Sequence, residues 1–199
     1  SSAIGSLTNA NKLANTFQSV ENVELSAPTI KQYLEYLEDA FIIEKAVRYD
    51  IKGKRYINTP YKYYFVDVGL RNARLNFRQQ EETHIMENII FNELRMRGFA
   101  VDVGIVEVNE KNEKGVYVRK QTEVDFVINK GNRRYYVQSA FRLPTVEKER
   151  QKERPLLSIS DSFKKIIIVR DNILLKRDEN GIMTVGLKEF LLDKNSLDL

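Results

Sequence analysis

Two acidic side chains project together from one predicted strand. Glu123 and Asp125 alternate with apolar residues within residues 122–128, and successive side chains of a strand point to opposite faces. A third acid, Glu87, lies at the margin of the apolar stripe of a predicted helix over residues 81–97. A carboxylate near a packed face is costly unless it is paired, hydrogen-bonded or bound to a cation. These acids are therefore candidates for a charged site, the alternative being that they are exposed residues at a sheet edge or reach solvent.

A neutral amide joins the acids from the next strand. A turn at residues 130–132 predicts a hairpin that leads into a strand over residues 134–140. Gln138 and Ala140 share one face of that strand because the side-chain period is two. Pairing with the preceding strand places this face beside Asp125.

The elements that carry these residues follow one another in a simple order. The predicted helix ends at Gly98, a residue typical of helix C-termini. Three strands, a charged helix and a further strand follow over residues 100–108, 122–128, 134–140, 146–154 and 166–169. A hairpin around residue 180 and a terminal segment over residues 187–192 complete the chain. We therefore expect an α+β or α/β domain over residues 81–199.

The first 80 residues predict a separate module of two helices and a hairpin. Thr8 or Asn9 caps a short helix, and Ser26, two residues before Pro28, begins a second one. Apolar residues of the second helix recur every three or four positions: Ile30, Tyr33, Leu34, Leu37 and Phe41. We expect this face to lie in the core. Two helices followed by a basic hairpin are typical of a winged helix.

Basic residues gather in two parts of the chain, although the formal net charge is only +4. Residues 44–62 contain six bases against two acids, and residues 133–154 contain seven against three. In a DNA-binding winged helix the second helix enters the major groove and the wing contacts phosphate. The candidate phosphate contacts are Lys52, Lys54, Arg55, Arg133 and Arg134. The alternative is that both patches are solvated faces and that the winged helix is purely structural.

The element order from residue 81 onward, with Glu87, Asp125 and a Gln-x-Ala pair at residues 138–140, resembles the PD-(D/E)xK nuclease fold. The resemblance implies an αβββαβ core. It also implies that Glu87, Asp125 and Gln138 stand where an intact member holds one or two Mg²⁺ ions through oxygen ligands. There the metal activates a water molecule, and a lysine helps to position the nucleophile.

Ala140 stands where that chemistry needs its lysine. Arg142, two residues farther along the same face, and Lys148, in the next helix, are the candidates for a displaced base. Arginine is the poorer substitute because its guanidinium is a broad, permanently charged fork. His84, the only histidine, lies three residues before Glu87 and is a candidate for the same site or a polar surface residue. The resemblance therefore implies a degenerate nuclease site in which the fold is kept and the reaction is not.

Five segments cover nearly the whole chain: IGSLTNANKLANTF, TIKQYLEYLEDAFIIEKAVRYD, YKYYFVDVGLRNA, HIMENIIFNELRMRGF and TEVDFVINKGNRRYYVQSAFRL. Together they resemble the C-terminal region of a prokaryotic AAA-type ATPase family. This resemblance implies a nucleotide-binding domain, then a winged helix, then a nuclease-like domain whose E-x-K pair is often eroded. The chain contains no G-x-x-x-x-G-K-[ST] loop. We therefore expect ATP to bind only to a domain upstream of Ser1, where the first helix of the winged helix would also lie.

Composition narrows the setting of the protein. Apolar residues make up 42% and charged residues 30% of the chain, which predicts a folded core. The chain has no cysteine, so disulfides and thiolate zinc sites are excluded and a reducing compartment is indicated. No apolar run approaches the ~20 residues of a membrane span. We expect a cytoplasmic protein without a membrane partner.

Two functions follow from these patterns. The first is a non-catalytic region that helps its upstream ATPase domain to bind DNA or a partner protein, through a winged helix over residues 1–80 and a degenerate nuclease-like domain over residues 81–199. It needs no cofactor of its own. The alternative is a metal-dependent DNA endonuclease that uses Mg²⁺ and a displaced catalytic base.

Overall fold

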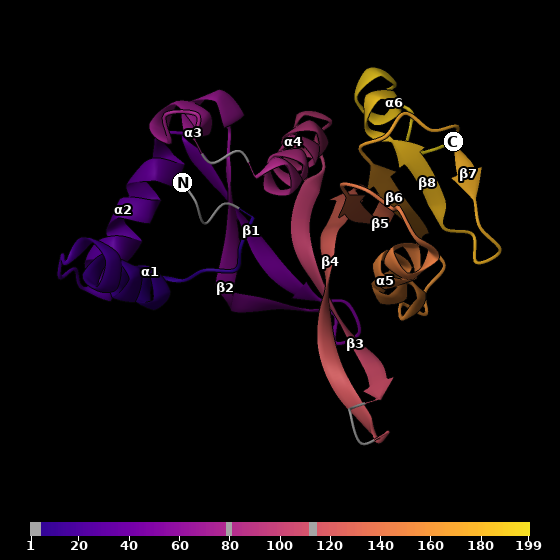
Figure 1. Cartoon of the computed structure of the whole chain (residues 1–199), viewed down its shortest axis with the longest axis horizontal. Helices are drawn as coiled ribbons and strands as arrows, with labels where there is room; N and C mark the ends of the chain where they lie inside the picture. Colours follow the sequence, from indigo (N-terminus) through magenta and orange to yellow (C-terminus); the bar gives the residue numbers. More distant parts are fainter. Residues whose placement is uncertain (1–4, 79–80, 112–114) are drawn as a thin grey trace.

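A computed structural model describes residues 5–78, 81–111 and 115–199 of the chain. One eight-stranded mixed sheet runs through it in the order β2-β1-β3-β4-β5-β6-β8-β7 (Figure 1). The strands are β1 Ile43–Asp50, β2 Arg55–Phe65, β3 Ala100–Lys111, β4 Tyr117–Lys130, β5 Arg133–Ala140, β6 Lys164–Val169, β7 Lys176–Arg177 and β8 Met183–Gly186. The helices are α1 Ala10–Thr16, η1 Phe17–Glu21, α2 Ala27–Asp39, α3 Val68–Arg74, α4 Glu82–Met96, α5 Val146–Leu157 and α6 Leu187–Leu192. The expected α+β class is confirmed.

The two N-terminal helices begin where their caps predict. The side chain of Asn9 accepts the N–H of Lys12 at 2.8 Å at the start of α1. Ser26 Oγ accepts the N–H of Thr29 at 3.2 Å at the start of α2. Each cap satisfies one of the backbone donors that the first helical turn leaves without a partner.

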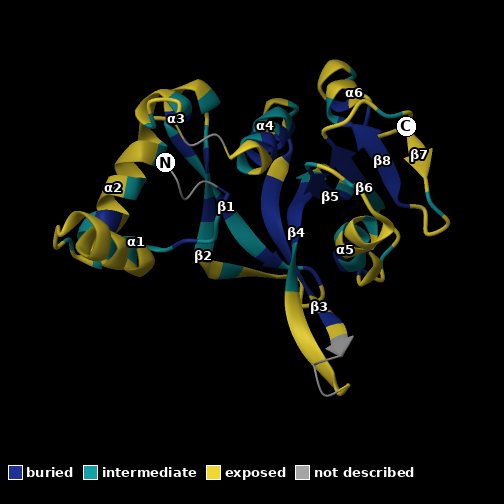
Figure 2. Cartoon of the chain, in the orientation of Figure 1, coloured by how far each residue is buried: buried dark blue, intermediate teal, exposed yellow. Residues whose placement is uncertain are grey.

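The expectation that one face of α2 lies in the core is wrong. Only Ile30 of this helix is buried, and most of α2 is coloured as exposed in Figure 2. Tyr33 is 51% exposed. Phe41 is 80% exposed because α2 ends at Asp39 and the backbone of Phe41 turns into the left-handed region, with φ of 54°. The helix packs on α1 and the beginning of β1, so most of its circumference faces solvent.

The hairpin of β1 and β2 belongs to the same sheet as the strands that follow. β1 pairs with β2 in antiparallel fashion and with β3 in parallel, from Arg48 opposite Val103 to Asp50 opposite Ile105. At the hairpin turn, the N–H of Ile51 donates to the carbonyl of Ile105 at 3.1 Å. The sheet is therefore continuous across residue 80, and the division into modules at this point stays a prediction.

From α4 to β6 the chain forms a helix, three strands, a helix and a strand, the order expected from the sequence. Helices α4 and α6 cover one face of the sheet, where Phe91 and Phe190 pack with Phe126. Helix α5 covers the other face, where Leu156 packs with Val127. Both faces of the central strands are therefore buried (Figure 2).

Strand β4 carries a bulge in the middle of the acidic segment. The β3–β4 pairing shifts by one residue between the pairs Asp102–Val127 and Gly104–Val124, so β4 contains one extra residue there. As a result, Val124 packs on the α5 side with Val127, while Phe126 packs on the α4 side. The strict alternation expected for this strand is therefore wrong at the bulge.

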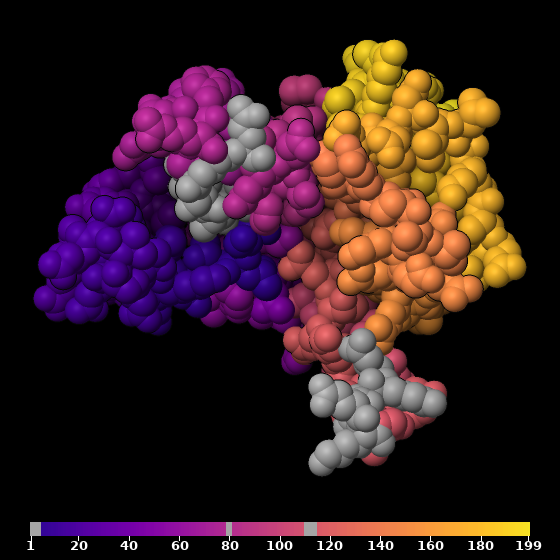
Figure 3. Space-filling view, viewed as in Figure 1, coloured from indigo at the N-terminus to yellow at the C-terminus, as the bar shows by residue number. Residues whose placement is uncertain are grey.

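Strands β3 and β4 continue beyond their neighbours as a two-stranded ribbon, paired from Glu107 and Gln121 to Lys111 and Tyr117. The space-filling view shows this ribbon projecting from the molecule, between the N-terminal helices at one end and the C-terminal strands at the other (Figure 3). In the part of the chain that the structure describes, no helix has both the length and the apolar character that crossing a membrane requires.

Candidate functional site

A cleft of about 570 Å³ opens between β4, β5 and α5. The charged and amide side chains that line it are Glu123, Asp125, Gln138, Arg142, Lys148, Gln151 and Lys152. Five residues that the sequence singled out therefore meet in one cleft: Glu123, Asp125, Gln138, Arg142 and Lys148. The alternative of an exposed sheet edge does not hold for Asp125, which is only 8% exposed, whereas the side chain of Glu123 is 30% exposed.

Side chains replace the backbone ladder at the floor of this cleft. The regular pairing of β4 with β5 extends from the turn only as far as Phe126 opposite Val137. Beyond that point, the N–H of Asp125 donates to Gln138 Oε1 at 3.2 Å and the N–H of Ser139 donates to Asp125 Oδ2 at 2.8 Å. Gln138 Nε2 donates to the carbonyl oxygen of Glu123 at 3.2 Å. Asp125 and Gln138 thus hold the two strands together while both line the cleft.

Glu87 is joined to this site by Lys62, a residue of β2. The Nζ atom of Lys62 lies 2.9 Å from Glu87 Oε1 and also forms an ion pair with Glu123. Its side chain is only 5% exposed. The hydroxyl of Tyr64 donates to the same Glu87 oxygen at 2.7 Å. Glu87 is therefore buried and paired and does not reach solvent, and its role in a site stays a prediction.

Charge interactions within this cluster favour a protonated Lys62. Burial alone would lower the pKa of Lys62, but the carboxylates of Glu87, Glu123 and Asp125 outweigh it and raise that pKa above its ordinary value. Burial raises the pKa of Glu123, with Lys62 opposing the shift. Burial and the neighbouring Glu87 raise the pKa of Tyr64. Lys62 is therefore an ammonium ion at neutral pH.

A second lysine approaches the floor of the cleft from α5. Lys152 Nζ lies 3.7 Å from Asp125 Oδ2, and its side chain is 38% exposed. The two bases proposed from the sequence, Arg142 and Lys148, line the wall of the cleft and have no ion-pair partner within the described residues. Lys152 was missed as a site residue, although it follows Lys148 by four residues and so shares its helix face.

The residues do not fit the Mg²⁺ ions that the nuclease resemblance implies. Ala140 is 1% exposed and packs in the apolar cluster beneath α5, so this position offers only a methyl group. The Lys62 ammonium contacts Glu87 and Glu123, and Gln138 Oε1 already accepts a backbone N–H. Over residues 5–78, 81–111 and 115–199, no group of three or more His, Cys, Asp or Glu side chains is placed to hold a metal ion.

The predicted wing residues lie at the turn between β1 and β2. Lys52 and Lys54 are exposed there, and Lys54 has a left-handed backbone with φ of 51°. Arg55 is exposed as well, and its Nε atom lies 3.5 Å from Asp50 Oδ2. This turn presents its cations to solvent, and none of these three residues lines the cleft.

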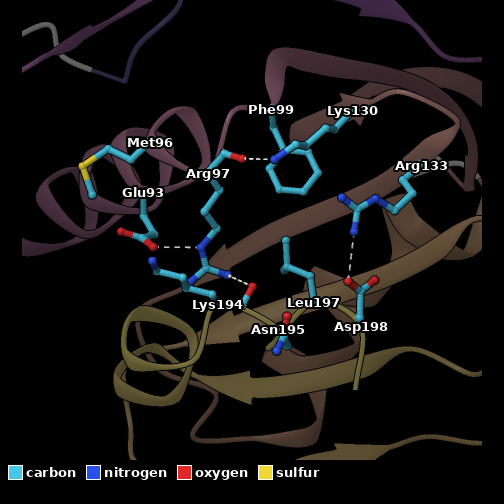
Figure 4. Close-up of a pocket in the computed structure, with 10 residues that line it drawn as sticks. All are labelled: Glu93, Met96, Arg97, Phe99, Lys130, Arg133, Lys194, Asn195, Leu197 and Asp198. Atoms are coloured by element: carbon cyan, nitrogen blue, oxygen red, sulfur yellow. Dashed lines mark hydrogen bonds and ion pairs between the residues drawn. The ribbon is translucent and has the colours of Figure 1, made fainter.

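The two arginines predicted to contact nucleic acid point in different directions. The guanidinium of Arg134 packs over the rings of Tyr49 and Phe163, at 5.2 and 5.6 Å from their centroids. Arg133 Nη1 lies 3.2 Å from Asp198 Oδ2, at the edge of a second hollow of about 480 Å³ (Figure 4). Neither joins Arg142 and Lys148 in lining the cleft.

Interactions in the second hollow tie the C-terminal segment to α4. Arg97 lies 2.8 Å from Glu93 Oε1 and donates to the carbonyl oxygen of Lys194 at 3.3 Å (Figure 4). It also donates to the carbonyl oxygen of Phe190. Lys130 Nζ donates to the carbonyl oxygen of Arg97 at 2.5 Å. These cations are engaged in holding elements together, so we assign this hollow a structural role.

Comparison with known proteins gives relatives without an assigned activity. Residues 1–81 match a family described as a domain of unknown function (DUF8612). An uncharacterized protein of Haemophilus influenzae is 39% identical over 189 residues, and one of Methanocaldococcus jannaschii is 33% identical over 188 residues. These alignments cover 95% and 92% of this chain but 43% and 38% of the relatives. The chain thus spans less than half the length of the curated relatives it matches.

Among solved structures, protein VC1899 from Vibrio cholerae aligns with 94% of this chain and 48% of its own, at 15% sequence identity and a TM-score of 0.35.

Proposed function

We propose that this chain is a non-catalytic region that binds DNA. In this proposal a winged helix over residues 1–80 and a degenerate PD-(D/E)xK nuclease-like domain over residues 81–199 serve a AAA-type ATPase domain that lies upstream. The association with an ATPase rests on the sequence resemblance. The binding role rests on the chemistry of the cleft.

The charge arrangement of the cleft carries the proposal. The acids of its floor are compensated, because Lys62 pairs with Glu123 and Lys152 lies 3.7 Å from Asp125. On the wall, Arg142 and Lys148 remain without a carboxylate partner in the described parts of the chain. Cations of this kind bind the phosphate backbone, which supplies most of the sequence-independent affinity for nucleic acid.

The non-catalytic part of the proposal is supported by two side chains. Ala140 contributes a buried methyl group where the nuclease motif has a lysine. Lys62 forms ion pairs with Glu87 and Glu123, so those oxygens are engaged with an ammonium ion. A site of this composition can hold phosphate near its cations, while the carboxylates of Glu87 and Glu123 are engaged with an ammonium ion.

Binding of a short DNA duplex, followed by fluorescence anisotropy over a salt series, tests the proposal. Replacing Arg142 and Lys148 together with alanine should weaken binding about tenfold or more and reduce the slope of log K against log salt by roughly 2, because each phosphate contact contributes about 0.9. The matched control replaces Lys188 and Lys194, two exposed lysines near the C-terminus, and should change the affinity by less than about twofold. A separate variant, Lys52→Ala with Lys54→Ala, measures the contribution of the wing.

Two outcomes would overturn the proposal. Absence of binding to duplex, single-stranded DNA and RNA at low salt would reject the nucleic-acid role and leave docking of a partner protein. Cleavage of DNA in Mg²⁺ or Mn²⁺ that disappears in Asp125→Ala would instead show the metal-dependent endonuclease. The approach of Lys152 to Asp125, at 3.7 Å, is the observation that favours this second function, with Lys152 as the displaced base.

A further inference from the structure

We propose that the Lys62 ammonium is the resident cation of the acid cluster, taking the place of a divalent metal ion, and that a metal ion binds there only when this ammonium is removed. The inference concerns the same cleft as the proposed function. It does not depend on nucleic-acid binding, because it concerns what neutralises Glu87 and Glu123.

The geometry makes the two cations mutually exclusive. Lys62 Nζ lies 2.9 Å from Glu87 Oε1 and is also in an ion pair with Glu123 Oε1. A divalent ion would have to stand between the same two oxygens, at roughly 2.0–2.6 Å from each. The ammonium fills that space and uses those lone pairs. The ammonium itself is shielded from solvent, because the Lys62 side chain is only 5% exposed.

The surrounding structure holds the cluster in place for a cation. Tyr64, on the same face of β2 as Lys62, donates its hydroxyl to Glu87 at 2.7 Å. On the other side, the N-terminal segment passes close to Glu87: a methyl group added at Gly5 would stand 3.5 Å from Glu87 Oε1 and 3.0 Å from His84 Nδ1. Gly5 has φ of 68°, and its N–H donates to the carbonyl of Tyr63 at 3.3 Å. Glu87 is therefore enclosed by Tyr64 on one side and by the N-terminal segment on the other, whereas Glu123 also lines the cleft.

Removal of the ammonium leaves two carboxylates near each other in a largely buried place. An uncompensated buried charge is among the most destabilising changes that a single substitution causes. A small divalent cation with oxygen ligands is the species that can restore neutrality there. Because Lys62 belongs to β2, whereas Glu87 and Glu123 lie on α4 and β4, the same side chain links the first 80 residues to the rest of the fold.

Thermal unfolding with and without divalent ions tests the inference, with ionic strength matched by NaCl. The melting temperature of the wild type should change by less than about 1 °C in millimolar Mg²⁺, Mn²⁺ or Ca²⁺. Lys62→Met should melt roughly 6–20 °C lower, and Mn²⁺ should restore about 5 °C or more of that loss. The control is Lys45→Met on β1, whose ion pair with Glu38 at 3.1 Å is partly exposed; it should melt within about 2 °C of the wild type, without a response to metal.

A double variant identifies the ligand. Lys62→Met combined with Glu87→Gln removes one carboxylate, so it should melt above Lys62→Met in the absence of metal and lose the response to Mn²⁺. Titration calorimetry should give saturable Mn²⁺ binding to Lys62→Met and none to the wild type or the double variant.

Three results would overturn the inference. The first is a folded Lys62→Met that does not respond to any of the three ions. The second is stabilisation of the wild type by a divalent ion that disappears in Glu87→Gln. The third covers poor folding. Lys62→Met and Lys62→Gln, which keeps an uncharged polar end, should both fold at least in Mn²⁺. If both variants stay unfolded with and without metal, replacement by a divalent cation is contradicted. Failure of the DNA-binding test leaves all three readouts unchanged.

Discussion

At the level of single residues, Lys62 differs from the other bases of its segment. In the sequence it is one of six bases between residues 44 and 62. In the structure Lys52 and Lys54 reach solvent from the turn, whereas Lys62 is buried within ion pairs. The signal that separates them is local: Lys62 lies two residues before Tyr64 in an aromatic strand, so both side chains share one face and both contact Glu87.

Asp102 gives a pH-dependent prediction at the same scale. It is buried on β3, and the hydroxyl of Tyr56 donates to its Oδ2 at 3.3 Å. Burial raises the pKa of Asp102, and the Tyr56 hydrogen bond and the charges of Arg134 and Arg95 only partly oppose it. The folded chain therefore binds this proton more tightly than the unfolded chain does. Protonated Asp102 therefore stabilises the folded state. This contribution to the unfolding free energy is lost as the pH rises through the folded-state pKa of Asp102.

Asp102→Asn keeps an acceptor for Tyr56 and removes the charge. We expect this variant to gain unfolding free energy relative to the wild type at pH 7, and to lose that gain as the pH is lowered toward about 4. Urea denaturation at a series of pH values measures the difference. Asp39→Asn, the same change at an exposed position of α2, is the control. A difference between Asp102→Asn and the wild type that is independent of pH would contradict the assignment.

At the level of elements, α5 positions the cations of the cleft. Its cap is Thr145, whose Oγ1 accepts the N–H of Lys148 at 3.3 Å. Thr145→Ala should lower the unfolding free energy by about 1 kcal/mol. It should also weaken DNA binding, because the first turn of α5 frays and no longer holds Lys148 in position. The control is Asn9→Ala, which removes the equivalent cap of α1 and should cost similar stability with DNA affinity unchanged. Equal DNA affinities for both variants and the wild type would contradict a role of α5 in DNA binding.

The sequence predicted those elements whose signals are local. Caps such as Asn9 and Ser26 mark helix starts because the chemistry involves residues within one turn. The face of β4 was predicted incorrectly because its bulge arises from pairing with β3, which the pattern of one strand does not contain. The exposure of Tyr33 on α2 was missed for a related reason: periodicity shows which residues share a face, but not whether another element covers that face.

For the candidate site, too, the sequence predicted the contacts within one hairpin and missed those that depend on distant strands. Asp125 and Gln138 were placed together because they lie on strands joined by a short turn, where register follows from the hairpin. Lys62 was not placed there because β2 reaches Glu123 only after the hairpin of β1 and β2 joins the sheet beside β3. That joining depends on tertiary packing, which no short segment of the chain encodes.

At the level of the whole molecule, contacts across residue 80 predict one cooperative unfolding transition. β1 pairs with β3, Lys62 pairs with Glu87, and Asn88 exchanges hydrogen bonds of 2.9 and 2.8 Å with the backbone of Phe65. Far-ultraviolet and near-ultraviolet circular dichroism should therefore give coincident urea transitions. Asn88→Ala should lower the midpoint and keep the transitions coincident, because β1 and β3 remain paired. Two separated transitions in the wild type would show that residues 1–80 and 81–199 fold independently.

Side chains close β4 onto β5 at the floor of the cleft. The Ser139 amide hydrogen is held by the Asp125 carboxylate, at 2.8 Å between nitrogen and oxygen, in place of a carbonyl of β4. Its exchange with solvent deuterium therefore depends on where that carboxylate points, while amides farther along β5 follow the opening of the sheet. The amide signal of Ser139 in a nuclear magnetic resonance spectrum thus reports whether the floor of the cleft keeps its arrangement when a phosphate group binds.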